Sequence, residues 1–195
     1  MTADNTCILA LDGHDALAES LARQLIAEGR DCRILACESR HFPDGELYFN
    51  LPENVAGADV IVLCHLHQPS DKTLALWFMA HHLKDMGAAR VGLVAPYLAY
   101  MRQDIRFQPG ECLTSRYFAD LINQSFDYLI TVDPHLHRYK SLDEIYRIPA
   151  FALHATDLIG DYLKTQVNNP LVVGPDEESE QWASEVAAVA GCDYL

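Results

Sequence analysis

The residues best suited to chemistry gather in one short stretch near the middle of the chain. Two tyrosines, Tyr97 and Tyr100, precede the consecutive Arg102, Gln103 and Asp104. An arginine guanidinium can donate two parallel hydrogen bonds to a phosphate, and its planar face can stack on a base. The stretch follows an apolar run that predicts a β-strand, and open α/β sheets bind ligands beyond the carboxyl ends of their strands. We therefore predict a nucleotide phosphate site around Arg102.

A second set of candidate ligands follows another predicted strand. Asp133 and His135 are a carboxylate and an imidazole that can together hold a divalent ion or its water shell. His137 completes a His-x-His pattern, which also occurs in metal-dependent hydrolases, where both imidazoles bind zinc or a similar ion. A surface loop with incidental histidines is the alternative interpretation of this segment.

Asp176 ends a third predicted strand, in the sequence Gly-Pro-Asp. One interpretation makes it a magnesium ligand, either direct or through water. The other makes this segment the start of a helix, because Glu177 and Glu178 follow and negative side chains are favourable near the amino end of a helix. The residues alone favour the second interpretation.

An aromatic ring and two carboxylates alternate at Phe42, Asp44 and Glu46. If this segment is extended, all three side chains lie on one face, where they can bracket an adenine ring. A hairpin with a polar rim explains the same residues equally well. The Pro-Asp-Gly turn within the segment predicts a hairpin or projecting flap over residues 41–51.

The elements that must position these residues alternate along the chain. Apolar runs predict strands, and apolar residues spaced three and four apart predict helices. Strands are predicted at 7–11, 32–36, 60–64, 91–95, 128–132 and 171–174, and helices at 15–28, 73–86, 115–124, 155–166 and 178–190. This alternation predicts an α/β fold with a mainly parallel sheet and helices on both faces, a three-layer α/β/α arrangement.

The same alternation predicts two domains. The first strand and helix series ends near Pro149, so residues 1–149 form the predicted N-terminal domain. Residues 150–195 start a second series of the same kind, which ends on what resembles the first residues of a strand at 193–195. We therefore expect an incomplete second domain.

Composition excludes several classes of protein. A net charge of −14 disfavours nucleic-acid binding, which needs a basic face. No apolar run has the length of a membrane span, and the first residues lack the features of a secretory leader. The six cysteines form no Cys-x-x-Cys pair, which argues against a cysteine-rich zinc site. We expect a reduced, cytoplasmic protein that binds neither nucleic acid nor membrane.

Four segments together resemble the ribose-phosphate pyrophosphokinases, also called phosphoribosyl diphosphate synthetases. They are Phe-Pro-Asp-Gly-Glu at Phe42–Glu46, Pro-Tyr-x-x-Tyr-x-Arg-Gln-Asp at Pro96–Asp104, Thr-Val-Asp-x-His at Thr131–His135, and Gly-Pro-Asp at Gly174–Asp176. Their order and spacing match the family, and the resemblance covers nearly the whole chain.

The resemblance implies a phosphoribosyltransferase-like (Rossmann-like) fold and a reaction. Enzymes of this family transfer the diphosphoryl group of ATP to the 1-hydroxyl of ribose 5-phosphate and release AMP, in nucleotide biosynthesis. It further implies that Arg102 and Gln103 contact ATP. Mg²⁺ is the implied cofactor, with His135 and Asp176 as ligands and Asp133 beside them.

The resemblance also implies an assembly. Phe42, Asp44 and Glu46 would form part of an adenine site contributed by a neighbouring subunit, so we expect a homo-oligomer, a dimer or a hexamer. The family's second half carries a flexible Lys-x-Arg loop and an acidic, glycine-rich loop that binds ribose 5-phosphate. Neither occurs in these 195 residues, so we expect this chain to be inactive alone.

Two other functions stay open on the sequence. A non-catalytic, regulatory homologue would keep the nucleotide site and assemble with active partners. A metal-dependent hydrolase built on His135 and His137 would need further ligands in later strands and tightly bound zinc.

Overall fold

A computed structural model describes residues 5–11, 13, 15–176 and 179–195. The chain divides between Ala152 and Leu153 into two compact units. The predicted acidic helix start at Glu177 and Glu178 lies outside the described residues. In the part of the chain that is described, every helix is too short or too polar to cross a bilayer.

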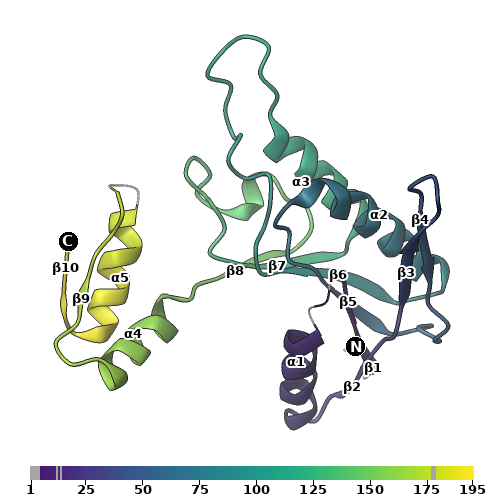
Figure 1. Cartoon of the computed structure of the whole chain (residues 1–195), viewed down its shortest axis with the longest axis horizontal. Coiled ribbons are helices and arrows are strands. Elements are labelled where there is room, and N and C mark those ends of the chain that lie inside the picture. Colours follow the sequence, from purple (N-terminus) through teal and green to yellow (C-terminus); the bar gives the residue numbers. More distant parts are fainter. Residues whose placement is uncertain (1–4, 12, 14, 177–178) are drawn as a thin grey trace. The chain divides into compact units, whose positions relative to one another are not determined.

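The first unit is built on a six-stranded sheet with helices on both faces (Figure 1). The strands lie in the order β2-β1-β5-β6-β7-β8, and β1, β2, β5, β6 and β7 pair in parallel. Their bounds are β1 Asn5–Ala10, β2 Asp31–Ile34, β5 Asp59–Leu63, β6 Arg90–Ala95, β7 Tyr128–Val132 and β8 Ala150–Leu153. The predicted α/β class with a mainly parallel sheet is confirmed.

Alternate residues of the central strands supply the two faces of the core. Ile8 and Leu63 pack against Ala18 and Ala22 of one helix, α1. On the other face, residues such as Leu93 pack in the larger cluster with two further helices, α2 and α3. The helices are α1 Asp15–Ala27, α2 Pro69–Asp85 and α3 Thr114–Ser125, with a short 3-10 turn, η1, at Leu142–Glu144. Successive side chains of a strand point to opposite faces of the sheet, so a sheet covered by helices on both sides needs apolar residues at both sets of positions.

A polar cluster joins the amino ends of three neighbouring strands. Asp59 accepts hydrogen bonds from Arg90 at 2.5 Å and from the Tyr128 hydroxyl at 3.1 Å. Burial, and then the charge of Asp59, raise the pKa of Tyr128 above its usual range. The Tyr128 ring lies over Gly92, its register partner in β6, where a Cβ atom would lie 1.9 Å from the ring carbon Cζ. Gly92 is therefore the residue that leaves room for this ring.

The predicted hairpin is confirmed and projects from the first unit (Figure 1). Its strands, β3 Glu38–His41 and β4 Leu47–Asn50, pair antiparallel. The first of them was not predicted, because all its residues are polar and exposed. β8 was also missed, since it is short and its residues are only partly buried.

The second unit is a small parallel βαβ arrangement. It contains α4 Thr156–Gln166, β9 Leu171–Val172, α5 Glu180–Ala190 and β10 Asp193–Tyr194, with β9 and β10 parallel. α4 packs against α5 through Gly160, where an added Cβ would lie 2.5 Å from Val189. The predicted strand at the end of the chain is thus present.

Most predicted bounds agree with the structure to within one or two residues. The main exception is α2, which begins at Pro69 and not at Thr73. Its first turn is polar except for the proline, so the apolar spacing that indicates a helix starts only one turn later. Proline fits the first turn of a helix because the amide hydrogen it lacks would have no partner there.

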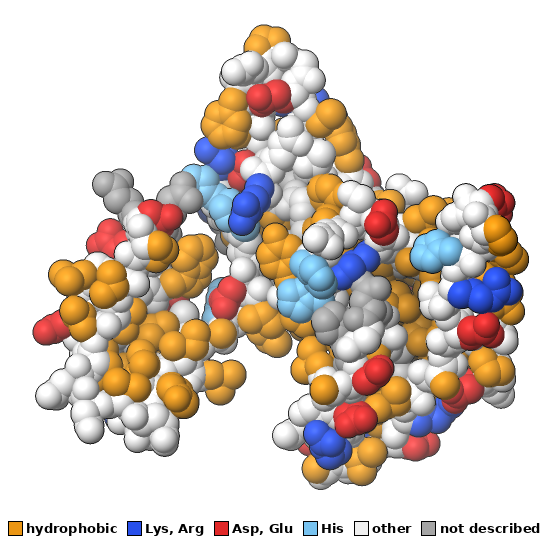
Figure 2. Space-filling view, viewed as in Figure 1, with side chains coloured by type: hydrophobic (Ala, Val, Ile, Leu, Met, Phe, Trp, Pro, Cys, Tyr) orange, Lys and Arg blue, Asp and Glu red, His pale blue; other side chains and the backbone are white. Residues whose placement is uncertain are grey.

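Acidic and basic side chains are interspersed over the described part of the face drawn in Figure 2. A mixture of both signs is typical of a solvated surface.

Candidate functional site

The loop after β6 is fixed by its apolar residues and presents its polar ones. Leu98, Ala99 and Met101 are almost fully buried, whereas Tyr97 is 44% exposed and Arg102 is exposed as well. The apolar side chains therefore hold the backbone while the guanidinium stays available to a ligand.

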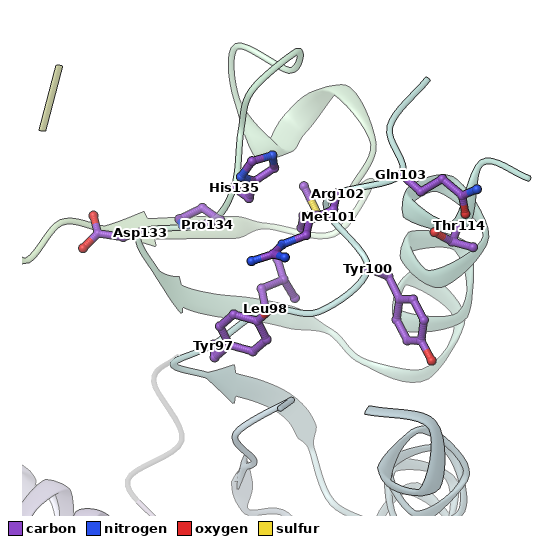
Figure 3. Close-up of a pocket in the computed structure, with 10 residues that line it drawn as sticks. All are labelled: Tyr97, Leu98, Tyr100, Met101, Arg102, Gln103, Thr114, Asp133, Pro134 and His135. Atoms are coloured by element: carbon purple, nitrogen blue, oxygen red, sulfur yellow. The ribbon is translucent and has the colours of Figure 1, made fainter. Parts of the chain in front are cut away.

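The ends of β6 and β7 enclose a cavity of about 310 Å³. Its lining comes from the loop after β6, the start of α3 and the loop after β7 (Figure 3): Tyr97, Leu98, Tyr100, Met101, Arg102, Gln103, Thr114, Asp133, Pro134 and His135. Two of the four predicted site segments thus meet in one pocket, because β6 and β7 are parallel neighbours whose carboxyl ends share an edge. This is the position where open α/β sheets bind ligands.

The two predicted metal ligands of the β7 loop point in different directions. Figure 3 shows the His135 ring on the pocket side near Arg102, and the Asp133 carboxylate directed away from both. Asp133 has a left-handed backbone with φ of 41°, so the chain turns sharply there. The His135 and His137 rings stack with centroids 5.8 Å apart. His135 is the residue of this loop best placed to meet a ligand in the pocket.

Two contacts that the sequence did not reveal tie the pocket loops together. Arg138 donates to the Asp104 carboxylate at 2.9 Å, and the hydroxyls of Ser115 and Tyr139 lie 3.1 Å apart in the interior. The Ser115 amide also donates to the Gln103 carbonyl at 3.3 Å. No local pattern could have found them, since the paired residues lie 34 and 24 positions apart.

Phe42, Asp44 and Glu46 lie in the hairpin turn and outside the pocket lining. The extended segment that would align them is absent: the Phe42 amide donates to the Glu46 carbonyl at 2.8 Å, and Asp44 accepts from the Glu46 amide. The extended interpretation, in which these three side chains lie on one face, is therefore wrong, and the hairpin interpretation holds. The exposed Phe42 ring lies 5.7 Å from Tyr48, and the Arg40 guanidinium lies over both rings.

Asp176 belongs to the second unit, and its carboxylate accepts from the Ser179 amide at 3.0 Å. Ser179 directly precedes α5, so this contact lies at the amino end of that helix.

The donor set of the pocket limits how it could hold a metal. Among the residues that the structure describes, no group of three His, Cys, Asp or Glu side chains could hold a metal ion. Mg²⁺ commonly binds through few protein ligands and completes its shell with phosphate oxygens and water. The pocket lining offers one imidazole, His135, so a metal ion bound there would take most of its ligands from a bound molecule and water.

Fold and pocket together define an open-sheet α/β protein with its ligand site beyond the carboxyl ends of the strands. Residues 6–125 match the model of the N-terminal domain of ribose phosphate pyrophosphokinase. This chain belongs to the ribose-phosphate pyrophosphokinase family.

Individual relatives agree with this assignment. A ribose-phosphate pyrophosphokinase of Sulfolobus acidocaldarius is 34% identical and aligns with 90% of this chain and 58% of its own length. One of Methanothermobacter thermautotrophicus is 32% identical over 96% of this chain and 64% of its own length. The crystal structure of phosphoribosylpyrophosphate synthetase from Mycobacterium smegmatis superposes with a TM-score of 0.82 at 26% identity, over 97% of this chain and 63% of that chain. The chain thus spans about three fifths of the length of these relatives.

Proposed function

We propose that this chain carries the ATP-binding part of a ribose-phosphate pyrophosphokinase. The complete reaction transfers the diphosphoryl group of ATP to the 1-hydroxyl of ribose 5-phosphate. A bond forms between that hydroxyl oxygen and the β-phosphorus, the bond from the β-phosphorus to the oxygen of the α-phosphate breaks, and AMP leaves. The observation that carries the proposal is the single pocket that joins Arg102 and Gln103 to His135.

The pocket residues suit this chemistry because phosphoryl transfer needs mainly positioning and charge neutralisation from the protein. The exposed Arg102 guanidinium is free to contact phosphate oxygens, and Gln103 beside it offers an amide donor and acceptor. Tyr97 and Tyr100 add apolar faces to the same cavity. In this proposal Arg102 holds the phosphates and the tyrosines limit the access of water.

His135 would hold Mg²⁺ together with phosphate oxygens and water. The bound ion would neutralise part of the phosphate charge. Asp133 remains a proposed metal ligand of the same loop. Asp176 remains a proposed magnesium-associated carboxylate of the second unit, where its Oδ1 accepts a hydrogen bond from the Ser179 amide.

Phe42, Asp44 and Glu46 would contribute to the adenine site of a neighbouring subunit in a homo-oligomer, a dimer or a hexamer. Their position supports this assignment, since the hairpin projects from the sheet and the Phe42 ring is 40% exposed. A reducing, cytoplasmic location is part of the proposal, because no disulfide joins any of the six cysteines in the described part of the chain.

Calorimetric titration with Mg-ATP tests the nucleotide site. The parent chain should bind, and Arg102→Ala should bind at least tenfold more weakly, because a charge-assisted contact to phosphate is lost. Arg147→Ala is the matched control: Arg147 pairs with Asp120 on the exposed face of α3, so its removal should leave the affinity unchanged. Equal affinity in Arg102→Ala and the parent would refute the assigned role of Arg102.

Turnover separates this proposal from the two alternatives. Without the ribose 5-phosphate loop we expect no AMP release from this chain, in the presence or absence of ribose 5-phosphate. A regulatory homologue would bind Mg-ATP and stimulate or inhibit an added active synthetase. A hydrolase would contain stoichiometric zinc, which metal analysis of the purified chain would detect.

A further inference from the structure

The two loops that form the pocket are joined by one ion pair with unequal burial. The Asp104 side chain is fully buried, and 36% of the Arg138 side chain is exposed. Arg138 Nη1 lies 2.9 Å from Asp104 Oδ1. The second oxygen, Oδ2, is buried and has no hydrogen-bond partner in the described part of the chain. Arg138 is therefore the main compensation for a buried carboxylate.

Both partners are next to proposed ligand-binding residues. Asp104 directly follows Arg102 and Gln103, and Arg138 lies three positions after His135. Neither partner lines the cavity. The ion pair thus connects the loop of Arg102 and Gln103 to the loop of His135 without lining the pocket.

The aromatic ring of Phe107 covers the outer side of this pair. The Arg138 guanidinium lies 5.0 Å from the centre of the ring, although the ring itself is 69% exposed. Glu111 holds the Phe107 segment in a closed turn, since its carboxylate accepts from the Phe107 amide at 2.8 Å. A guanidinium that stacks on an aromatic ring keeps its charge and its N–H donors but has fewer accessible rotamers. The contact with Phe107 therefore helps to hold Arg138 in the orientation that reaches Asp104.

We propose that Arg138 is a positioning residue that keeps Arg102 and Gln103 in register with His135 through its ion pair with Asp104. A buried carboxylate without its cation is strongly unfavourable. If Arg138 is removed, the least costly response is for the loop to move Asp104 into water. That movement displaces the two residues before Asp104, so nucleotide affinity falls although Arg138 never touches the nucleotide.

The neighbouring hydroxyl contact cannot replace the ion pair. Ser115 in α3 contacts Tyr139 of the loop after β7, but both hydroxyls are neutral, and their contact does not compensate the charge on Asp104. The inference therefore makes a specific prediction: the damage caused by losing Arg138 depends on the charge of residue 104. A role in packing alone would not have this dependence.

Tryptic cleavage after Arg102 tests the loop in the absence of nucleotide. Arg138→Ala should speed this cleavage at least tenfold over the parent. When Asp104→Asn is added to Arg138→Ala, the cleavage rate should return most of the way to the parental rate, because the buried charge is gone. The rate of Arg138→Lys should lie between those of the parent and Arg138→Ala. Cleavage after Arg23 in α1 reports global unfolding and should stay constant, as should all rates in Arg147→Ala.

Mg-ATP titration of the same variants should follow the same order, with affinity lost in Arg138→Ala and largely recovered when Asp104→Asn is added. The inference is overturned if Arg138→Ala matches the parent in cleavage after Arg102, or if Asp104→Asn brings no recovery. If Arg138→Ala unfolds the chain, the double variant and Arg138→Lys decide the question.

The affinity readout rests on the proposed function, whereas the cleavage readout does not. Charge-dependent opening of the loop in a chain that binds no Mg-ATP would support the positioning role and refute the nucleotide site. If the chain binds Mg-ATP with the same affinity with and without Arg138, the nucleotide site is supported and the positioning role is refuted.

Discussion

Gly92→Ala should destabilise the first unit, although alanine normally improves a strand. Gly92 lies in β6, which leads directly into the loop that carries Arg102. An alanine Cβ would lie 1.9 to 2.4 Å from three carbon atoms of the Tyr128 ring. No non-bonded carbon atoms tolerate that separation, so the ring must leave its place.

The expected cost follows from what the ring would lose. Its hydroxyl donates to the carboxylate of Asp59, and such a bond to a charged group contributes about 1.5–3 kcal/mol. The Arg90 guanidinium over the ring contributes about 0.5–1 kcal/mol more. Replacing glycine within a strand returns about 0.5–1 kcal/mol. The lost contacts outweigh the gain from replacing glycine, so we expect a net loss of about 1–3.5 kcal/mol in the free energy of unfolding.

Urea unfolding followed by the fluorescence of Trp77 measures this loss. Trp77 lies in α2 of the first unit and Trp182 in α5 of the second, so a Trp182→Phe background restricts the signal to the unit under test. Gly92→Ala should lower the midpoint without changing the slope.

A double variant isolates the overlap from other effects of the added methyl group. In a Tyr128→Ala background the ring is absent, so Gly92→Ala should be neutral or slightly stabilising. An equal cost in both backgrounds, or no cost in the parent, would refute the reasoning.

Three further outcomes follow from the structure. Gly160→Ala should weaken the packing of α4 on α5 and destabilise the second unit by about 2–4 kcal/mol, read from Trp182 fluorescence, whereas unchanged stability would contradict the close approach of these helices. Burial raises the pKa of Tyr128 and Tyr146 in the folded state, so stability should be complete below about pH 10 and fall above it as the unfolded phenols ionise first. Replacing both tyrosines by phenylalanine should flatten this decline in alkaline unfolding curves. Ellman's reagent should find one fast thiol in the native chain, and Cys112→Ser should remove it, because this cysteine is the exposed one of the six.

Local sequence patterns predicted most of the fold. Apolar runs such as Val60–Leu63 and Tyr128–Val132 form core strands, because the same few consecutive residues both favour extended backbone and leave water on folding. The patterns failed where the residues are polar or only half buried. β3 is exposed at every position, so nothing in its composition distinguishes it from a loop.

The chemistry of the pocket was also readable, residue by residue. Arg102 and His135 were predicted as ligand-binding residues because they follow strands, and the family resemblance added Gln103. The structure places all three around one cavity. At residues 42–46 the sequence left two interpretations open, and the structure shows the hairpin turn and not the extended alignment. Phe42 and Glu46 are bonded across a tight turn, since a proline and a glycine between them favour reversal of the chain over extension.

The sequence by itself determined the alternation of strands and helices and the polar residues that follow each strand, because both depend on neighbours in the chain. Only the tertiary structure decided which of those loops meet. β6 and β7 lie side by side, Asp133 turns away while His135 faces the pocket, and Arg138 reaches a carboxylate 34 positions earlier. Contacts of that separation depend on the order of strands in the sheet and on the burial of single charges, neither of which a local pattern records.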